Sequence, residues 1–240
     1  MPCPLKDLLV GKVAPLGARG APSGIAKSPV QSVLSLTELG FSGDEQGDRV
    51  RHGGPEKAVH HYPFDHYAMW AKEIGHHAML KQPGAFGENL STEGMTEETV
   101  AIGDVFRLGS ATIEISQGRQ PCWKLNERFG RSDMAKSVQT SGRTGWYYRV
   151  IIAGEVAPGD RLTLIDRPFP DWTVARVWRV FYIDTLNRRE LEALAELPAL
   201  AEGWRTHAAR RLQTNRVEGW TKRLTGADAP RDVTNDGDKV

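Results

Sequence analysis

The chain has 240 residues, of which 40% are hydrophobic and 25% are charged, and these are the proportions of an ordinary globular protein. Its formal net charge of +1 gives no global field to hold nucleic acid or an anionic membrane, so we expect neither as a partner. No apolar run reaches the roughly 18 residues of a membrane span, and the start lacks the basic and apolar segments of a signal peptide, which predicts a cytoplasmic protein.

The two cysteines, Cys3 and Cys122, bear on the redox chemistry of the chain. They lie far apart in the sequence, which is a poor basis for a disulfide framework in a domain of this size. Reduced thiols in the cytoplasm are therefore expected. No Cys-x-x-Cys pair occurs, and this argues against an iron–sulfur cluster and against a structural zinc site.

The first part of the chain combines short strands with glycine-rich turns. Residues 8–13 predict a strand, and residues 30–33 predict a second one. Glycine and charged residues are dense from Leu39 to Pro55, which indicates several tight turns or a backbone shaped around a ligand. Residues 64–74 place apolar side chains at helical spacing after Pro63, and they form the one clear helix expected before residue 170.

Short strands continue up to residue 165. Residues 105–108 and 111–115 alternate at period two around the two-residue turn Gly109-Ser110. Residues 147–152 and 161–165 are also rich in strand-forming types. Many short strands joined by glycine turns favour a β-barrel over a sandwich of long strands.

The composition changes near Pro168-Phe169-Pro170, and the chain then becomes helical. A helix is expected from residue 174, with Asp171 or Thr173 as its N-cap. Residues 188–197 are rich in Glu, Leu and Ala and predict a second helix. Pro198 interrupts this helix, and residues 201–213 predict a third.

These elements predict a fold that is mainly β, of the α+β class. Residues 1–166 are expected to form a barrel domain with a few helices, and residues 171–224 a small bundle of three helices. Residues 225–240 are rich in Asp and poor in large apolar side chains, which predicts a disordered tail.

Cys122 is the strongest candidate for chemistry, in the segment Arg119-Gln120-Pro121-Cys122-Trp123-Lys124. Pro121 restricts the backbone before it, so the approach to the thiol is rigid. Arg119 and Lys124 flank it, and nearby cations favour the thiolate, which is both the nucleophile and the metal ligand. The alternative, on equal footing, is a small buried apolar residue, because most free cysteines have that role.

Other polar motifs carry weaker signals. His52-Gly53-Gly54 is able to bring backbone N–H groups to an anion, although a tight turn is the simpler explanation. His60, His61 and His66 have poor spacing for a shared metal ion. The side-chain amide of Asn89 is able to hydrogen-bond to both donors and acceptors of a heterocycle. The alternative is that Asn89 is a turn residue. The basic residues of the last helices are expected to lie on a face exposed to solvent. The net charge gives little support to nucleic-acid binding by these helices.

Taken in order, five pieces of the sequence resemble the MOSC family, named after the C-terminal domain of molybdenum-cofactor sulfurases. The pieces are Leu39–Asp44, His52–Val59, Ala85–Leu90, Gly103-Asp104 and Arg119–Leu125. The resemblance covers about residues 1–166. Residues 171–214 are similar to the three-helix appendage of small bacterial members that are linked to resistance against 6-N-hydroxylaminopurine.

The resemblance implies a β-barrel that binds a molybdenum–pterin cofactor. The family cysteine either ligates molybdenum or carries sulfur as a persulfide, and Cys122 stands at its position. Matching positions imply further cofactor-pocket residues, namely His52, Gly53, Gly54, Asn89, Arg119 and Lys124. A soft thiolate is a suitable ligand for a redox-active metal. The guanidinium of an arginine is able to bind the pterin phosphate through two parallel hydrogen bonds. Binding of pyridoxal phosphate is a further association at family level.

The lead hypothesis from this resemblance is a reductase that converts N-hydroxylated nucleobase analogues, such as 6-N-hydroxylaminopurine, to amines for detoxification. Cys122 would ligate the metal, and His52 would donate the proton that releases water, because histidine titrates near neutrality. The chain has neither the cysteines of an iron–sulfur cluster nor a recognisable flavin or nicotinamide fingerprint. We therefore expect a separate electron-donor protein.

Three other functions remain open from the sequence. Cys122 could form a persulfide and hand its sulfur to a metal–sulfur cofactor under assembly, with no metal bound. The chain could be a non-enzymatic ligand-binding or scaffold protein whose C-terminal helices recruit a partner. A cysteine hydrolase would need a base such as His52 or His60 in contact with Cys122.

Overall fold

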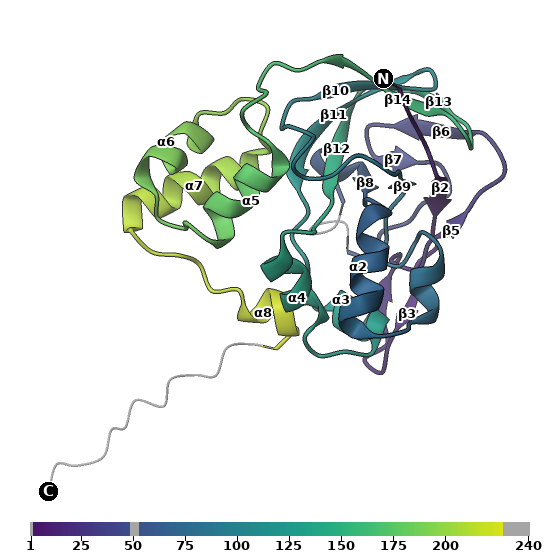
Figure 1. Cartoon of the computed structure of the whole chain (residues 1–240), viewed down its shortest axis with the longest axis horizontal. Helices are drawn as coiled ribbons and strands as arrows, with labels where there is room; N and C mark the ends of the chain where they lie inside the picture. Colours follow the sequence, from purple (N-terminus) through teal and green to yellow (C-terminus); the bar gives the residue numbers. More distant parts are fainter. Residues whose placement is uncertain (1, 49–52, 228–240) are drawn as a thin grey trace, which may run out of the picture.

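The computed structural model describes residues 2–48 and 53–227. It confirms the α+β class, with a strongly curved mixed sheet and a group of helices beside it (Figure 1). None of the described helices has the length and apolar character needed to cross a membrane.

A nine-stranded sheet forms most of the first domain. Its strand order is β1 (Cys3–Pro4), β14 (Arg161–Asp166), β10 (Val105–Leu108), β11 (Ala111–Gly118), β12 (Trp146–Ile152), β8 (Val59–His61), β9 (Leu90–Ser91), β2 (Asp7–Val10) and β5 (Ser28–Pro29). Neighbouring strands are antiparallel, with the exception of the parallel pair β8 and β9. The turn Gly109-Ser110 joins β10 to β11 as the sequence predicts, and Gly109 has a φ of 58°.

The N-terminal segment brings the two ends of this sheet together. β1 pairs with β14 at one end of the strand order, and β2, only a few residues later, pairs with β9 near the other end. Between them, the Leu5 N–H donates to the Asp160 carbonyl and the Lys6 N–H to the Ser91 carbonyl, both at 2.8 Å. The sheet is therefore a partly closed barrel, which agrees with the predicted barrel.

Two small sheets complete the β structure. One has the order β13 (Gly154–Val156), β6 (Leu34–Thr37) and β7 (Gly40–Phe41), and the other pairs β3 (Ala14–Leu16) with β4 (Ala21–Ser23). The strand predicted over residues 30–33 is displaced, since β6 begins at Leu34. The predicted first strand is shorter than expected and ends at Val10, because the Gly11 N–H donates to the Asp44 carboxylate instead of a neighbouring strand.

Helices cover one end of the barrel and enclose a second apolar core. They are α2 (Asp65–Ile74), the short 3₁₀ helix η2 (Ala78–Lys81), α3 (Lys124–Phe129) and α4 (Met134–Ser141). α2 is the helix that the sequence predicts, and it buries Tyr67 and Trp70. α3 and α4 were not expected, because helices of 6 and 8 residues are too short to show a clear periodic pattern.

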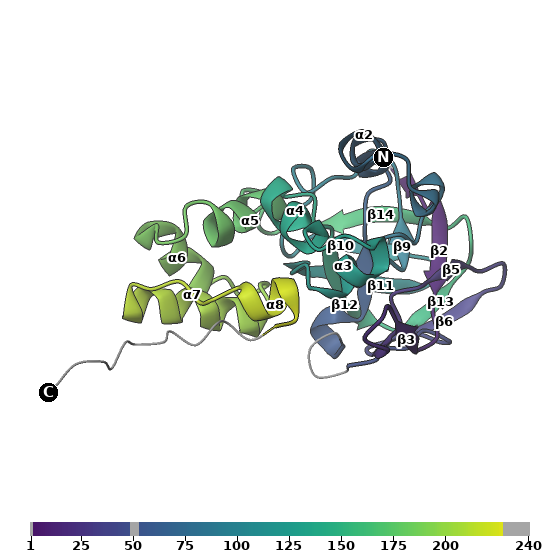
Figure 2. The ribbon, with the colours of Figure 1, turned by 90° about the horizontal axis from the view of Figure 1, so that it is seen from below.

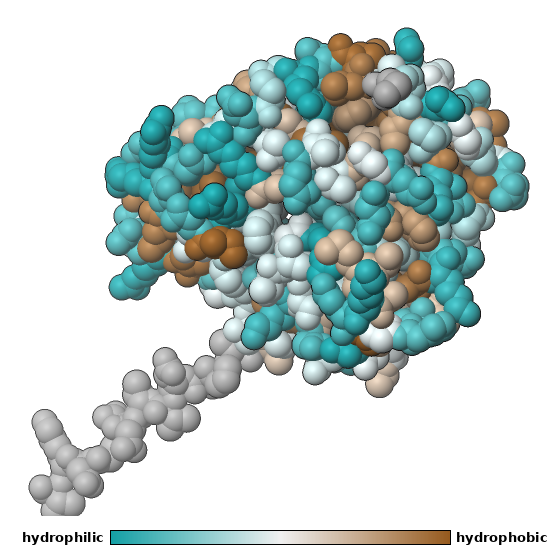
Figure 3. Space-filling model, in the orientation of Figure 1, coloured by the Kyte–Doolittle hydropathy of each residue, from teal (hydrophilic) through white to brown (hydrophobic). Residues whose placement is uncertain are grey.

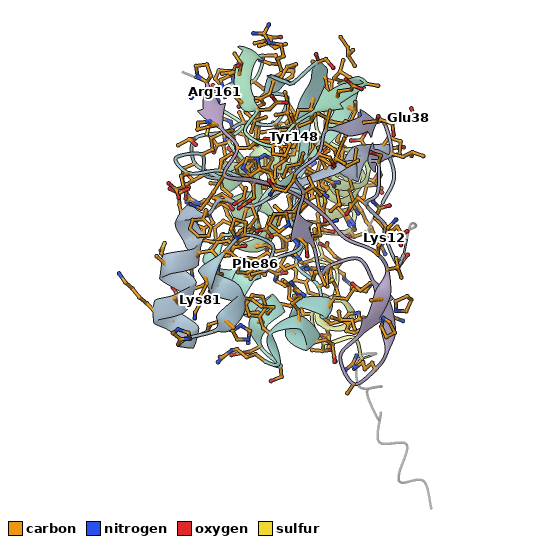
Figure 4. All side chains as sticks on the ribbon, turned by 90° about the vertical axis from the view of Figure 1, so that its right-hand side faces the viewer. Lys12, Glu38, Lys81, Phe86, Tyr148 and Arg161 are labelled. Carbon is orange, nitrogen blue, oxygen red and sulfur yellow. The ribbon has the colours of Figure 1, made fainter. Side chains whose placement is uncertain are left out.

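The two apolar cores are separate clusters. Inside the barrel, Tyr148 belongs to the larger cluster, and Phe86 belongs to the smaller one under the helices. Figure 4 shows both side chains in the interior of the molecule, with Lys12, Glu38, Lys81 and Arg161 nearer its periphery. Phe86 stacks on Tyr62 with ring centroids 4.0 Å apart, so the loop that carries it is fixed in the smaller core.

Three helices form a separate group after the barrel: α5 (Val174–Tyr182), α6 (Arg188–Ala195) and α7 (Glu202–Thr214). Thr173 caps α5, since its side chain accepts the Arg176 N–H, which confirms one of the two predicted caps. Trp204 of α7 packs edge-on against Phe181 of α5, with centroids 4.6 Å apart. The surface of this group is mostly hydrophilic, with a small hydrophobic area (Figure 3).

The last described helix, α8 (Thr221–Thr225), leaves this group and returns to the barrel (Figure 2). The Trp123 N–H donates to the Arg223 carbonyl, and the Asn126 side chain donates to the Leu224 carbonyl, both at 2.8 Å. The structure thus differs from a single bundle over 171–224, because α8 satisfies its polar groups against α3. Residues 228–240, most of the predicted tail, lie outside the described part of the chain.

Candidate functional site

Cys122 lies at the wall of a pocket where several distant segments converge. It follows β11 and precedes α3, and it is buried, with 8% of its surface exposed. The space within its lining is about 650 Å³, including the open solvent at its mouth. Its lining comes from residues 23–27, 44–47, 57–60 and 86–89, from the segment 119–124, and from Tyr147.

Arg119 is buried beside Cys122 with an incomplete set of partners. It is 6% exposed, and its Nη2 donates to the Phe86 carbonyl at the long distance of 3.5 Å. Its Nη1 is buried and has no hydrogen-bond partner. No described carboxylate lies within ion-pair distance of it. Because burying a guanidinium is costly without a partner, this arrangement indicates a place for an anion.

His60, another residue of the pocket lining, also has an unsatisfied buried atom. The residue is 4% exposed, and its Nε2 is buried without a partner. Burial and the nearby charge of Arg119 lower the pKa of His60 well below 6.5, so the ring is neutral at pH 7. The ring packs on Tyr147 with centroids 5.0 Å apart. His60 is therefore a neutral, buried residue of the pocket lining, and its Nε2 lies near Gly145.

Three lysines add positive charge to the pocket. Lys27 forms a buried ion pair with Asp44, so its charge is matched within the protein. Lys124 donates to the Pro22 carbonyl at 3.0 Å, which holds its ammonium at the pocket wall. Lys57 ends the 3₁₀ helix η1 (Pro55–Lys57); burial lowers its pKa, and the charges of Asp48 and Cys122 oppose that effect. Together with Arg119, these lysines exceed the charges of Asp44 and Glu45 in the lining.

Comparison with known proteins agrees with this geometry. Residues 48–163 match the MOSC domain, and residues 172–215 match the YiiM-like, 3-alpha helix domain. Protein YiiM of Escherichia coli (strain K12) is 42% identical over 224 residues, which cover 92% of this chain and 97% of that protein. The chain belongs to the MOSC family. Both matched segments lie inside the two domains predicted from the sequence.

Two further proteins are similar to this member of the MOSC family. The crystal structure of YiiM from Escherichia coli superimposes with a TM-score of 0.79 at 36% identity, covering 93% of this chain and 98% of that one. A protein named "Reductase" from Gibberella moniliformis (strain M3125 / FGSC 7600) is 38% identical over 177 residues, covering 73% of this chain. That match takes in 31% of the fungal protein.

Most of the predicted site residues that the structure describes line this one pocket of the MOSC domain. Cys122, Arg119, Lys124 and Asn89 are all in its wall. Gly53 and Gly54 are not; they precede η1, where Gly54 has a φ of 91° and its carbonyl accepts the Lys57 N–H at 2.9 Å. This turn therefore positions Lys57. His52 lies outside the described residues.

Asn89 uses its amide mainly to hold the pocket wall together. Its Nδ2 donates to the Leu9 carbonyl at 3.1 Å and to the Asp44 carboxylate at 3.0 Å. Its Oδ1 accepts the His60 N–H at 3.1 Å. Direct contact of Asn89 with a pterin stays a prediction, and in this structure the side chain ties the His60 strand to Asp44.

Glu88 fixes the loop between Gly84 and Asn89. Its carboxylate is fully buried and accepts the N–H groups of Gly84 at 2.7 Å and Phe86 at 3.1 Å, together with the Tyr67 hydroxyl. Burial raises the pKa of Glu88, and these donors oppose that effect. The Phe86 carbonyl is thereby held where it meets Arg119.

Arg223 of α8 holds the backbone on both sides of Cys122. Its carbonyl accepts the Trp123 N–H at 2.8 Å, and its Nη1 donates to the Pro121 carbonyl. Its Nη2 donates to the Gln139 side chain of α4. A residue one hundred positions downstream therefore fixes the segment that carries the thiol, and sequence inspection gave no sign of it.

A molybdenum–pterin cofactor fits the residues of this pocket. The thiol of Cys122 would supply a soft ligand for molybdenum. Arg119 would supply a buried cation with an unsatisfied N–H for a phosphate. Lys27, Lys57 and Tyr147 also line the pocket without having been predicted as site residues, although Lys57 lies within the His52–Val59 piece of the MOSC resemblance.

Proposed function

We propose that this chain is a molybdenum-cofactor-dependent reductase that converts N-hydroxylated compounds, such as 6-N-hydroxylaminopurine, to amines. The observation that carries the proposal is the buried, unsatisfied guanidinium of Arg119 in the pocket wall beside Cys122. A buried cation that has an unsatisfied N–H and no carboxylate partner among the described residues is stabilised when an anionic ligand binds. The fungal relative named "Reductase" supports a redox activity.

Each pocket residue has a role in this proposal. Cys122 binds the metal through its sulfur, and Arg119 and Lys124 bind the anionic part of the cofactor. Asn89 and Glu88 keep the wall rigid. When bound, the cofactor supplies two-electron chemistry, and the protein supplies binding and orientation.

The proposed reaction breaks the N–O bond of the substrate. The nitrogen takes up two electrons and one proton to become the amine, and a second proton joins the leaving oxygen so that it departs as water. This step needs a proton donor at the oxygen. His52 remains the predicted donor, and it lies outside the described residues.

The electrons come, in this proposal, from a separate reductase protein. The chain contains two cysteines, Cys3 and Cys122, and no recognisable flavin or nicotinamide fingerprint. The match to the fungal "Reductase" leaves more than half of that protein outside it. Turnover by the pure protein with NADH alone would contradict this part of the proposal.

The test is an anaerobic assay of the protein purified from a cofactor-producing host, with a reduced viologen dye as electron donor. Adenine formed from 6-N-hydroxylaminopurine is measured by chromatography. We expect the wild type to form adenine and Cys122→Ser to lose at least about 100-fold in rate, as is usual when a group at the reacting centre is removed.

The matched control is Cys3→Ser. Cys3 lies in β1, and its sulfur donates to the Glu93 carbonyl at 3.4 Å, in another part of the barrel. It should retain the wild-type rate. A wild type that forms no adenine, but whose Cys122 gains the mass of a persulfide sulfur, would refute the reductase and favour the sulfur carrier.

A further inference from the structure

Glu97 carries a buried carboxylate outside the cofactor pocket. The residue is 1% exposed and lies in the chain between β9 and β10. Its Oε2 is 2.7 Å from Nε2 of His66, a buried residue of α2, and its Oε1 accepts the Gly145 N–H at the same distance. A buried carboxylate is costly unless its oxygens have hydrogen-bond partners, and Glu97 has one at each oxygen. Both oxygens are therefore fixed in direction.

The backbone of Glu97 is fixed by the C-terminal helical group. The Ala175 N–H, in the first turn of α5, donates to the Glu97 carbonyl at 2.9 Å. The neighbouring Val174 N–H donates to the Val100 carbonyl at 3.0 Å. Glu97 is therefore held by α5 through its backbone and by α2 through its side chain. Its carboxylate is a rigid acceptor at the boundary between the barrel and the helices.

Gly145 connects this carboxylate to the anion site. Its carbonyl accepts the Arg119 N–H at 3.0 Å, which extends the ladder between β11 and β12 by one bond, and it also accepts the Thr144 hydroxyl at 3.0 Å. The φ of Gly145 is 69°, a conformation that favours glycine. A Cβ at this position would lie 2.3 Å from the His61 carbonyl oxygen. The Gly145 peptide is thus tightly enclosed, with its N–H on Glu97 and its carbonyl on Arg119.

We propose that Glu97 is a positioning residue for the anion site of the cofactor pocket. Its carboxylate fixes the Gly145 peptide, and the Gly145 carbonyl fixes the backbone that carries the Arg119 guanidinium. Without this acceptor the buried Gly145 N–H is left unsatisfied, and the peptide turns to find another partner. The role of Arg119 as a cofactor ligand rests on the proposed function, whereas the link from Glu97 to Arg119 is measurable without any cofactor.

The experiment follows hydrogen exchange of backbone N–H groups by NMR in cofactor-free protein. The quantity is the ratio of the exchange rate at Arg119 to that at Ile113, in the middle of β11, so that a general loss of stability cancels. Glu97→Met removes the acceptor, and we expect the ratio to rise at least about tenfold. Glu97→Asp withdraws the carboxylate by one methylene group and should raise the ratio about threefold, and it replaces Glu97→Met if that variant does not fold.

Two control variants separate positioning from a general effect on the barrel. Glu97→Gln keeps a side-chain oxygen for the Gly145 N–H and gains an amide donor toward His66, so its ratio should stay within about twofold of the wild type. Thr92→Val removes a fully buried hydroxyl that lies 2.9 Å from Nε2 of His61, and it should also leave the ratio at Arg119 unchanged.

Molybdenum retained by the loaded protein is the second readout. Glu97→Met should retain about tenfold less than the wild type, as is usual when a hydrogen bond that supports a metal site is lost, and both controls should retain the full amount. An unchanged ratio in Glu97→Met and Glu97→Asp, an equal rise in either control, or a raised ratio with full retention would each overturn the proposal. A wild type without molybdenum would instead refute the proposed function, and the exchange ratio alone would then decide whether Glu97 holds Arg119.

Discussion

Arg119 of the barrel pocket and Arg211 of the helical group are both buried arginines, but their surroundings differ. Arg211 is 1% exposed; it forms a two-point ion pair with Glu218 and donates to the carbonyls of Phe181 and Thr185. Arg119 has the long bond to Phe86, no carboxylate among the described residues, and an unsatisfied Nη1. A satisfied buried arginine belongs to the structure, whereas an unsatisfied one in a pocket wall indicates a ligand.

The largest effect on stability is expected for Arg211→Met. The change leaves the Phe181 and Thr185 carbonyls without their donor and breaks the pair with Glu218, so the free energy of unfolding should fall by about 3 kcal/mol. Urea titration measures it. Arg210→Met, on the exposed side of the same helix, is the control and should change stability by less than about 0.5 kcal/mol. A loss below about 1 kcal/mol in Arg211→Met would remove the contrast with Arg119.

A smaller loss is expected for Arg223→Met, which removes the donor to the Pro121 carbonyl. The free energy of unfolding should fall by about 1–2 kcal/mol, because a buried carbonyl loses its partner. The specific readout is the alkylation of Cys122 by iodoacetamide, which should become faster relative to Cys3 as the segment loosens. Arg216→Met, at an exposed position between α7 and α8, should leave the ratio unchanged. An unchanged ratio in Arg223→Met would show that α8 does not position the thiol.

Arg119→Met gives the opposite pattern to Arg211→Met. Removing a buried charge that lacks a counterion should cost the cofactor-free protein less than about 1 kcal/mol in stability, and it should reduce retained cofactor at least about tenfold. Urea titration of cofactor-free protein and metal analysis of loaded protein measure the two effects. A loss of more than about 2 kcal/mol without loss of cofactor would make Arg119 a structural residue like Arg211.

The last expected effect is a pH dependence of stability in the helical group. Burial alone would raise the pKa of Glu218, but the hydrogen bonds from Arg211 and from backbone and Trp220 donors hold it at about 2, below the ordinary 4.5. A lowered pKa stabilises the folded state above pH 4.5, and this contribution is lost as the pH falls from 4.5 toward 2. Thermal unfolding across this range should show a decline in the wild type that is weaker in Glu218→Gln. Equal declines would assign the acid sensitivity to other groups.

Local sequence signals predicted much of the fold. The Gly109-Ser110 hairpin, helix α2, the Thr173 cap and the helices after Pro168 all depend on residues close together in the chain. α3 and α4 were missed because they are short. The position of α8 was missed because its contact with Trp123 joins segments one hundred residues apart, and no local pattern encodes such a contact.

The candidate site, like the fold, was predicted from the sequence only where its residues are close together in the chain. Arg119, Cys122 and Lys124 are neighbours in one segment, so the MOSC resemblance placed them together. Lys27, Tyr147 and His60 reach the pocket from three other segments, and their convergence depends on how the barrel curls. The unsatisfied atoms of Arg119 and His60 are properties of the folded pocket, and the sequence carries no sign of them.

The most direct test of the account is elemental analysis for molybdenum on protein purified from a cofactor-producing host. The central claim is that the pocket beside Cys122 holds a molybdenum–pterin cofactor through the cysteine sulfur and the Arg119 guanidinium. We predict near-stoichiometric molybdenum in the wild type and in Cys3→Ser, and its loss in Cys122→Ser. Equal molybdenum in Cys122→Ser and wild type, or none in either, would contradict the claim.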